Sequence, residues 1–203
     1  MQRLFGDDAA PGPDAVAAAD APLATRMRPR TLDEFVGQDR LLEAGAALRT
    51  AIEEGRPHSM ILHGPPGTGK TTLARLVADA SHAAFEEQSA VQAGRAEVRA
   101  VIARARERLN TTGTKTIFFL DEIHRFNKAQ QDALLPAVEE GLVTLIGATT
   151  ENPYYEVNSA LLSRTQVYEL ESLAPEDLAV VVRRGAEEVG AEVSDEIVDL
   201  IAR

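Results

Sequence analysis

The chain has 203 residues, of which 44% are hydrophobic, so it can bury the core of one domain and part of a second. It contains no cysteine, which excludes disulfides and thiolate metal sites, and its four histidines show no metal-ligand spacing. The formal net charge is −11, but the acidic excess lies at the two ends, in residues 1–24 and 169–203. The middle is near neutral, so any nucleic-acid contact must come from a local basic face.

The N-terminal segment shows no targeting signal. Met1–Pro22 lacks the basic and apolar regions of a secretory signal, and no stretch of the chain is apolar over enough residues to span a membrane. We therefore expect a cytoplasmic protein. Residues 6–22 are rich in Ala, Asp, Pro and Gly, a composition typical of flexible chain, so we expect a flexible leader over residues 1–23.

Ordered structure is expected from about residue 24. In Pro22–Gln38, three arginines alternate with apolar positions, and a proline blocks the continuation of a helix. Asp39 is the expected cap of a helix that runs to about Glu54. The apolar stripe of this helix consists of Leu41, Leu42, Leu48 and Ile52. Ser59–His63 is then a short apolar run suited to a buried strand.

The segment Gly64–Thr71, Gly-Pro-Pro-Gly-Thr-Gly-Lys-Thr, matches the phosphate-binding pattern G-x-x-x-x-G-K-[ST]. It lies between the expected strand and a run with helical spacing, which disfavours the alternative of a glycine-rich turn with a chance lysine. Its glycines leave backbone N–H groups free to converge on phosphate oxygens. Lys70 can reach the β- and γ-phosphates, and the Thr71 hydroxyl can ligate Mg²⁺. The residues expected to bind nucleotide here are Gly64, Pro65, Pro66, Gly67, Thr68, Gly69, Lys70, Thr71 and Thr72.

A second unit of strand and helix follows. Ala84–Ser89 predicts the end of a strand, and Arg95–Leu109 predicts a helix. The apolar face of this helix consists of Val98, Val101, Ile102, Ala105 and Leu109. Residues 128–140 predict a further helix ended by Gly141, and Leu142–Ala148 predicts another buried strand.

Thr116–Glu122 combines an apolar strand with two carboxylates at its carboxyl end, where ligands bind in open α/β sheets. Asp121 is expected to hold the metal through its water shell, and Glu122 to orient and deprotonate a water that attacks the γ-phosphate. Acidic residues after a buried strand are often only helix caps. Their position downstream of a phosphate-binding loop favours the catalytic interpretation.

These motifs resemble, in order, those of AAA+ ATPases of the clamp-loader and Holliday-junction-motor group. Within that group the sequence is similar to the replication-associated recombination protein A family, also called MgsA, which is related to the eukaryotic Werner-helicase-interacting protein. The segments that carry this resemblance are Pro22–Pro29, Val36–Gln38, His58–Leu62, Asp121–Asp132 and Ile146–Pro153. The resemblance implies an α/β fold, a P-loop NTPase with a parallel five-stranded sheet flanked by helices. It places the AAA+ core over residues 24–171 and the beginning of a helical lid over residues 172–203.

The resemblance also implies roles for single residues. Thr150 corresponds to the sensor-1 residue that contacts the γ-phosphate or the attacking water, and Arg164 to an arginine finger that acts in the neighbouring subunit's site. Val36 and Gly37 match the segment that contacts adenine, and Ser89 falls where related ATPases place a switch residue that restrains the catalytic glutamate. The alternatives are a strand-end turn for Thr150 and a surface salt bridge for Arg164.

The family's sensor-2 arginine follows a helix resembling Asp195–Arg203, and this chain stops before it; Arg183 and Arg184 lie in an earlier helix and do not match. Family members continue into a tetramerisation region, so the chain resembles an N-terminal fragment whose own turnover is open. Gln2–Phe5 resembles peptides that dock on bacterial sliding clamps. A basic helix face can contact DNA in related rings, but interleaved Glu97 and Glu107 also suit a solvated face. Its arginines are Arg95, Arg99, Arg104, Arg106 and Arg108.

The implied function is hydrolysis of ATP with Mg²⁺, used to act on DNA or replisome components at stalled replication forks in the bacterial cytoplasm, near the nucleoid. The implied partners are forked or junction DNA and identical subunits, as a tetramer. Three alternatives stay open: a clamp-loader subunit, a Holliday-junction branch-migration motor, and a nucleotide-binding assembly subunit without turnover. The Asp121–Glu122 pair and Ser163–Arg164 disfavour a P-loop kinase.

Overall fold

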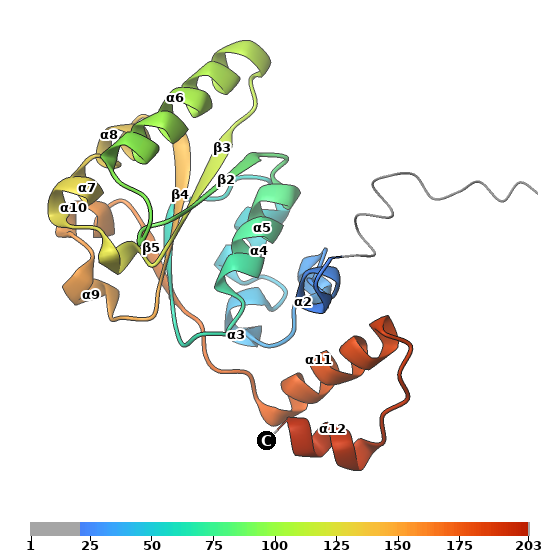
Figure 1. Cartoon of the computed structure of the whole chain (residues 1–203). Coiled ribbons are helices and arrows are strands. Elements are labelled where there is room, and N and C mark those ends of the chain that lie inside the picture. Colours follow the sequence, from blue (N-terminus) through green and yellow to red (C-terminus); the bar gives the residue numbers. More distant parts are fainter. Residues whose placement is uncertain (1–20, 203) are drawn as a thin grey trace, which may run out of the picture. The chain divides into compact units, whose positions relative to one another are not determined.

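A computed structural model describes residues 21–202, which form two compact units. One comprises residues 29–174; the other contains α2 (Leu23–Arg26), α11 (Pro175–Glu188) and α12 (Asp195–Ile201) (Figure 1). Gln2–Phe5 and most of the expected leader lie outside the described residues. Within residues 21–202, no helix is both long enough and apolar enough to cross a membrane.

The larger unit is built on one sheet of five parallel strands in the order β2-β3-β4-β1-β5, which confirms the predicted fold class. The strands are β1 (Met60–His63), β2 (Ala84–Ser89), β3 (Thr116–Asp121), β4 (Val143–Thr149) and β5 (Gln166–Glu169). The sequence located four of these strands within a residue or so. It did not locate β5, a four-residue edge strand whose two end residues are exposed, because such a strand has no continuous apolar run.

Helices cover both faces of this sheet, as Figure 1 shows for α6 on one face and α4 with α5 on the other. Side chains of β3 alternate between two cores: Phe118 and Leu120 pack in one cluster with Val98 of α6, and Phe119 packs in the other with Leu73 of α5. The helices and 3-10 turns of this unit are η1 (Leu32–Glu34), α3 (Asp39–Leu42), α4 (Ala47–Glu53), α5 (Lys70–Ala80), α6 (Arg95–Thr112), η2 (Ile123–Arg125), α7 (Lys128–Asp132), α8 (Leu135–Glu139), α9 (Pro153–Glu156) and α10 (Ser159–Leu162).

Two helices that the sequence predicted as continuous are each broken in two. The segment from Asp39 to Glu54 is interrupted between α3 and α4, because Glu43, directly after α3, is extended and Gly45 then adopts a left-handed φ of 88°. The expected helix over 128–140 breaks between α7 and α8. Pro136 lies in the first turn of α8, where its missing N–H group is tolerated, and it cannot donate the bond that would continue α7.

The boundaries of the compact units differ slightly from the expected ones. The division falls after Arg28 and Ala174. The segment of α2 belongs to the smaller unit because Arg26 pairs with Glu188 at 3.4 Å and Met27 packs on Gly185 of α11. A methyl group added to Gly185 would lie 3.1 Å from the Met27 Cε, so the glycine permits this close contact.

Gln131 of α7 joins the segment after β3 to the segment after β4. It is 1% exposed, and its side-chain amide donates to the carbonyl groups of Phe126 and Glu156, both at 3.0 Å. Its Oε1 accepts the N–H of Asn158 at 2.7 Å. Asn158 in turn caps α10 through the N–H of Leu161 at 2.7 Å. Both segments are therefore held as one hydrogen-bonded block.

We expect Gln131→Leu to lower the free energy of unfolding by about 2–4 kcal/mol, because it leaves two carbonyl groups and one N–H group without their partner. Urea denaturation measures this change. Lys128→Leu, at an exposed position of the same helix, is the matched control and is expected to stay within about 0.5 kcal/mol of wild type. Equal stability of the two variants would contradict the role of Gln131.

Candidate nucleotide-binding site

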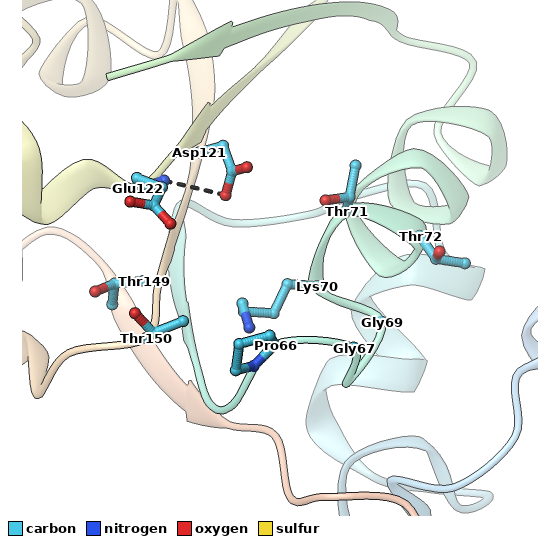
Figure 2. Close-up of a pocket in the computed structure, with 10 residues that line it drawn as sticks. All are labelled: Pro66, Gly67, Gly69, Lys70, Thr71, Thr72, Asp121, Glu122, Thr149 and Thr150. Carbon is cyan, nitrogen blue, oxygen red and sulfur yellow. Dashed lines mark hydrogen bonds between the residues drawn. The ribbon is translucent and has the colours of Figure 1, made fainter. Parts of the chain in front are cut away.

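A pocket of about 370 Å³ lies at the carboxyl ends of β1, β3 and β4. Ligands of open α/β sheets bind at this edge. Figure 2 shows the loop before α5 on one side of the pocket and the ends of β3 and β4 on the other. The lining residues are Pro66, Gly67, Gly69, Lys70, Thr71, Thr72, Asp121, Glu122, Thr149 and Thr150.

The loop between β1 and α5 needs its glycines. Gly64, Gly67 and Gly69 all have positive φ, at 155°, 80° and 90°. A Cβ on Gly64 would lie 2.2 Å from the carbonyl oxygen of Leu170, and one on Gly69 would lie 2.6 Å from the ring of Phe35. The loop can thus follow this path only without side chains at these points. The loop ends at Lys70, the first residue of α5. The first N–H groups of a helix have no partner within the helix, and such helix ends commonly bind anions.

Thr68, Gly64 and Pro65, which were predicted to bind nucleotide, are not among the lining residues. Thr68 is 3% exposed, and its hydroxyl donates to the Pro65 carbonyl at 3.0 Å. Thr68 therefore braces the loop from within. Gly64 and Pro65 present their carbonyl oxygens to Lys70, whose Nζ donates to both at 2.7 Å.

Lys70 is a charged group in a confined place. Burial lowers the pKa of its ammonium group, and the nearby carboxylates of Asp121 and Glu122 oppose this effect. The lysine therefore lies between loop carbonyls and the acid pair, with its charge partly desolvated. An anion that enters the pocket would stabilise the charged form.

The acid pair is held by the backbone at the end of β3. Glu122 has a left-handed φ of 55°, which is uncommon outside glycine, and its N–H group donates to Asp121 Oδ1 at 3.0 Å (Figure 2). This sharp bend turns both carboxylates to the pocket. Glu122 Oε2 lies 3.5 Å from Arg125 Nε and 3.6 Å from His124 Nε2.

Two consecutive threonines follow on β4, the strand beside β3. Thr150, the predicted sensor, is exposed and lines the pocket just past the end of the strand. Thr149 was not predicted as a site residue, but it also lines the pocket; it is 1% exposed, and its hydroxyl lies 2.9 Å from His124 Nδ1. No local pattern indicated Thr149, because its contact with His124 joins residues that are 25 positions apart in the sequence.

The structure does not bring the other predicted residues into the lining of this pocket. Arg164, just after α10, pairs with Glu139 at 2.5 Å and donates to the Ala160 carbonyl at 2.8 Å. The Ser89 hydroxyl accepts the N–H of Val91 at 3.3 Å. Val36 and Gly37 are flanked by Phe35, whose ring packs on Gly69, and by Gln38, which exchanges hydrogen bonds with Glu171.

The donor set of the pocket fits a magnesium nucleotide. Among residues 21–202, no three His, Asp or Glu side chains come together as a metal site. Asp121 and the Thr71 hydroxyl both line the pocket, and such a sparse pair of oxygen donors suits Mg²⁺, which keeps several waters and binds substrate phosphates. The loop glycines leave room beside backbone N–H groups for those phosphates.

The comparison with protein families decides the assignment. Residues 60–172, which span the loop, the acid pair and all five strands, match the model of the AAA family, ATPases associated with various cellular activities. The chain belongs to the AAA family of ATPases. The pocket-lining residues all lie within the segment that this family model matches.

Individual relatives of this AAA chain narrow the group. It is 56% identical over 167 residues to replication-associated recombination protein A of Escherichia coli K12, covering 82% of this chain and 37% of that protein. It is 48% identical to ATPase WRNIP1 of Dictyostelium discoideum, and that match covers 82% of this chain and 19% of that protein. These matches confirm the family that the Asp121–Asp132 and Ile146–Pro153 motifs predicted. The chain spans well under half the length of these relatives.

Among solved structures, the Thermotoga maritima RuvB Holliday junction branch migration motor has a similar fold. Its TM-score is 0.72 at 32% identity, and the match covers 87% of this chain and 59% of that one. The fold of this chain is therefore similar to that of a Holliday-junction motor, the group that the order of the sequence motifs indicated.

We expect Lys70→Ala to weaken ATP binding tenfold or more, because it removes a charge-assisted phosphate contact worth about 1.5–3 kcal/mol. Titration calorimetry measures the affinity. Lys115→Ala, an exposed lysine outside the pocket, is the control and is expected to bind as wild type does. Unchanged affinity in Lys70→Ala would count against the loop as the phosphate site.

Proposed function

We propose that this chain binds ATP with Mg²⁺ and hydrolyses it to ADP and phosphate. The observation that carries the proposal is the meeting of Lys70 and Thr71 with Asp121 and Glu122 around one pocket. Phosphoryl transfer to water needs a phosphate cradle, a pair of metal ligands and a base for the water, and these four side chains supply all three.

In this proposal, loop N–H groups and Lys70 bind the phosphates. Thr71 and Asp121 would hold Mg²⁺, which when bound would neutralise charge on the phosphate oxygens. Glu122 accepts a proton from a water, whose oxygen forms a bond to the γ-phosphorus while the bond to the β-phosphate oxygen breaks. Thr150 orients the water or the γ-phosphate. Val36 and Gly37 contact adenine, and Ser89 keeps no assigned role because its hydroxyl bonds locally.

Arg164 is proposed to act on the ATP of a neighbouring subunit. Arg164 does not line the pocket of its own chain. It lies on an exposed corner formed by α10 and α8, where its ion-pair partner Glu139 is also half-exposed. A guanidinium on such a corner can be presented to another subunit without any change in the fold. Hydrolysis would then depend on assembly, proposed here to be a tetramer in the full-length protein.

The cellular role is proposed from the relatives. A protein named for replication-associated recombination, an ATPase WRNIP1 and a Holliday junction branch migration motor share this domain, so we propose work on DNA or the replisome at stalled forks. A clamp-loader subunit or a branch-migration motor is the second candidate, favoured by the fold likeness to the Holliday junction motor. A subunit without turnover is less favoured, because both carboxylates and Lys70 lie around the pocket.

The basic face of α6 gives little support to DNA contact. Arg104 and Arg108 both pair with Glu86, and Arg106 pairs with Glu140. The hydrogen bonds from Arg104 and Arg108 lower the pKa of the Glu86 carboxyl group, so its charge offsets part of the positive charge of this face. Arg95 donates to the Ala129 carbonyl. A solvated face that stabilises the domain explains most of these arginines better than DNA binding does.

We expect Glu122→Gln in the full-length protein to bind Mg-ATP nearly as wild type does while hydrolysis falls by about 10²–10⁴, the range for a lost general base. The assay is phosphate release with and without forked DNA, and we expect DNA to raise the wild-type rate. Glu107→Gln, on the exposed face of α6, is the control. Parallel loss of binding and turnover would make Glu122 a metal or structural residue.

We expect Arg164→Ala subunits, mixed into full-length wild-type oligomers, to lower activity more than dilution does, while each variant subunit still binds ATP. Arg99→Ala subunits, which lose an exposed arginine of α6, are the control and should only dilute.

The 203-residue chain alone is expected to be mostly monomeric at micromolar concentration, with ATP binding and little turnover. Light scattering and phosphate release measure both. If the monomer hydrolysed ATP at a rate insensitive to Arg164→Ala, Arg164 would not be acting in the site of a neighbouring subunit.

A further inference from the structure

His124 connects the proposed catalytic carboxylate to the end of the neighbouring strand. Its side chain is 8% exposed, in the 3-10 turn η2 just after Glu122. On one side its Nδ1 lies 2.9 Å from the Thr149 hydroxyl, and on the other its Nε2 lies 3.6 Å from Glu122 Oε2. The imidazole thus spans the gap between β3 and β4 at the edge where the pocket lies.

The hydrogens around Thr149 constrain this imidazole. The Thr149 oxygen accepts the N–H of Glu151 at 3.0 Å, and its one hydrogen can go either to the Glu151 carbonyl at 3.2 Å or to His124 Nδ1. If it goes to Nδ1, the neutral ring carries its proton on Nε2, facing the Glu122 carboxylate. If it goes to the carbonyl, Nδ1 must donate and a lone pair faces that carboxylate. The charge of Glu122 favours the first arrangement.

We propose that His124 is a positioning residue for Glu122: Thr149 orients the imidazole, and the Nε2–H group of the imidazole sets where the carboxylate rests. The inference builds on the proposed function, in which Glu122 is the base. At 3.6 Å the contact is just longer than a hydrogen bond, so a small rotation of the carboxylate makes or breaks it. In this arrangement Thr149, at the end of β4, affects the position of the Glu122 carboxylate just after β3 through the His124 ring.

Arg125 also lies near Glu122, but it is a weaker restraint. Its side chain is 62% exposed, against 8% for His124, and exposed ion pairs contribute little. A buried imidazole fixed by a second hydrogen bond loses less freedom when it meets the carboxylate. The carboxylate therefore has one fixed partner and one mobile partner.

The test uses two replacements that each keep one nitrogen position of the ring. His124→Asn keeps a polar atom where Nδ1 contacts Thr149 and loses the group at Glu122; His124→Gln does the reverse. In the full-length protein we expect kcat to fall about 10- to 100-fold in His124→Asn, with an unchanged ATP dissociation constant and melting temperature, and to recover partly in His124→Gln. In a Glu122→Gln background, His124→Asn should have no further effect.

A readout independent of turnover is the long-range ¹H–¹⁵N spectrum of the imidazole, at a pH where the ring is neutral. We expect the Nε2-protonated form in wild type and its loss in Thr149→Val. Wild-type kcat in His124→Asn, or a ring protonated on Nδ1, would overturn the inference. If Glu122→Gln itself hydrolysed ATP normally, the proposed function would fail, and that outcome is distinct from a normal His124→Asn beside an inactive Glu122→Gln.

Discussion

The site depends on one close approach between backbones. The Gly64 N–H donates to the Thr149 carbonyl at 3.2 Å, and Leu170 lies so near Gly64 that no Cβ fits between them. Leu170 in turn donates to the His63 carbonyl at 2.7 Å. The ends of β1, β4 and β5 therefore meet at a single glycine. From that point the loop leads to α5, and its residues Pro66, Gly67 and Gly69 line the pocket opposite the acid pair at the end of β3.

Beyond this junction, polar side chains carry the geometry outward from the pocket. His124 connects the bend after β3 to Thr149, and Gln131 and Asn158 connect α7 to α10. Each of these groups bridges segments that are distant in sequence but follow the neighbouring strands β3 and β4. The residues that follow β3 and β4 thus behave as one block, which holds Glu122 at one end and Arg164 at the other.

Patterns that depend on neighbouring residues were readable from the sequence: the glycine spacing of Gly64–Thr71, the apolar runs of β1, β3 and β4, and the acids after Thr116–Leu120. Features that depend on three-dimensional neighbours were not. The break after α3 and the short edge strand β5 leave no mark in the hydrophobic periodicity of the sequence. Thr149 and His124 matter only because the sheet order sets β3 beside β4, and no spacing in the sequence announces their contact.

The pairing of Arg164 with Glu139 bears on whether this arginine can serve a second subunit. Both side chains are more than one third exposed, so solvent screens the pair, and exposed pairs of this kind contribute about 0–1 kcal/mol. A charge-assisted bond to a phosphate in a water-poor interface is worth about 1.5–3 kcal/mol. In the proposed assembly, a phosphate of the neighbouring subunit's ATP would therefore outcompete Glu139 for the Arg164 guanidinium. In the separate chain the same carboxylate keeps the guanidinium folded against α8 and α10, so the surface salt bridge and the arginine finger are compatible states of one side chain.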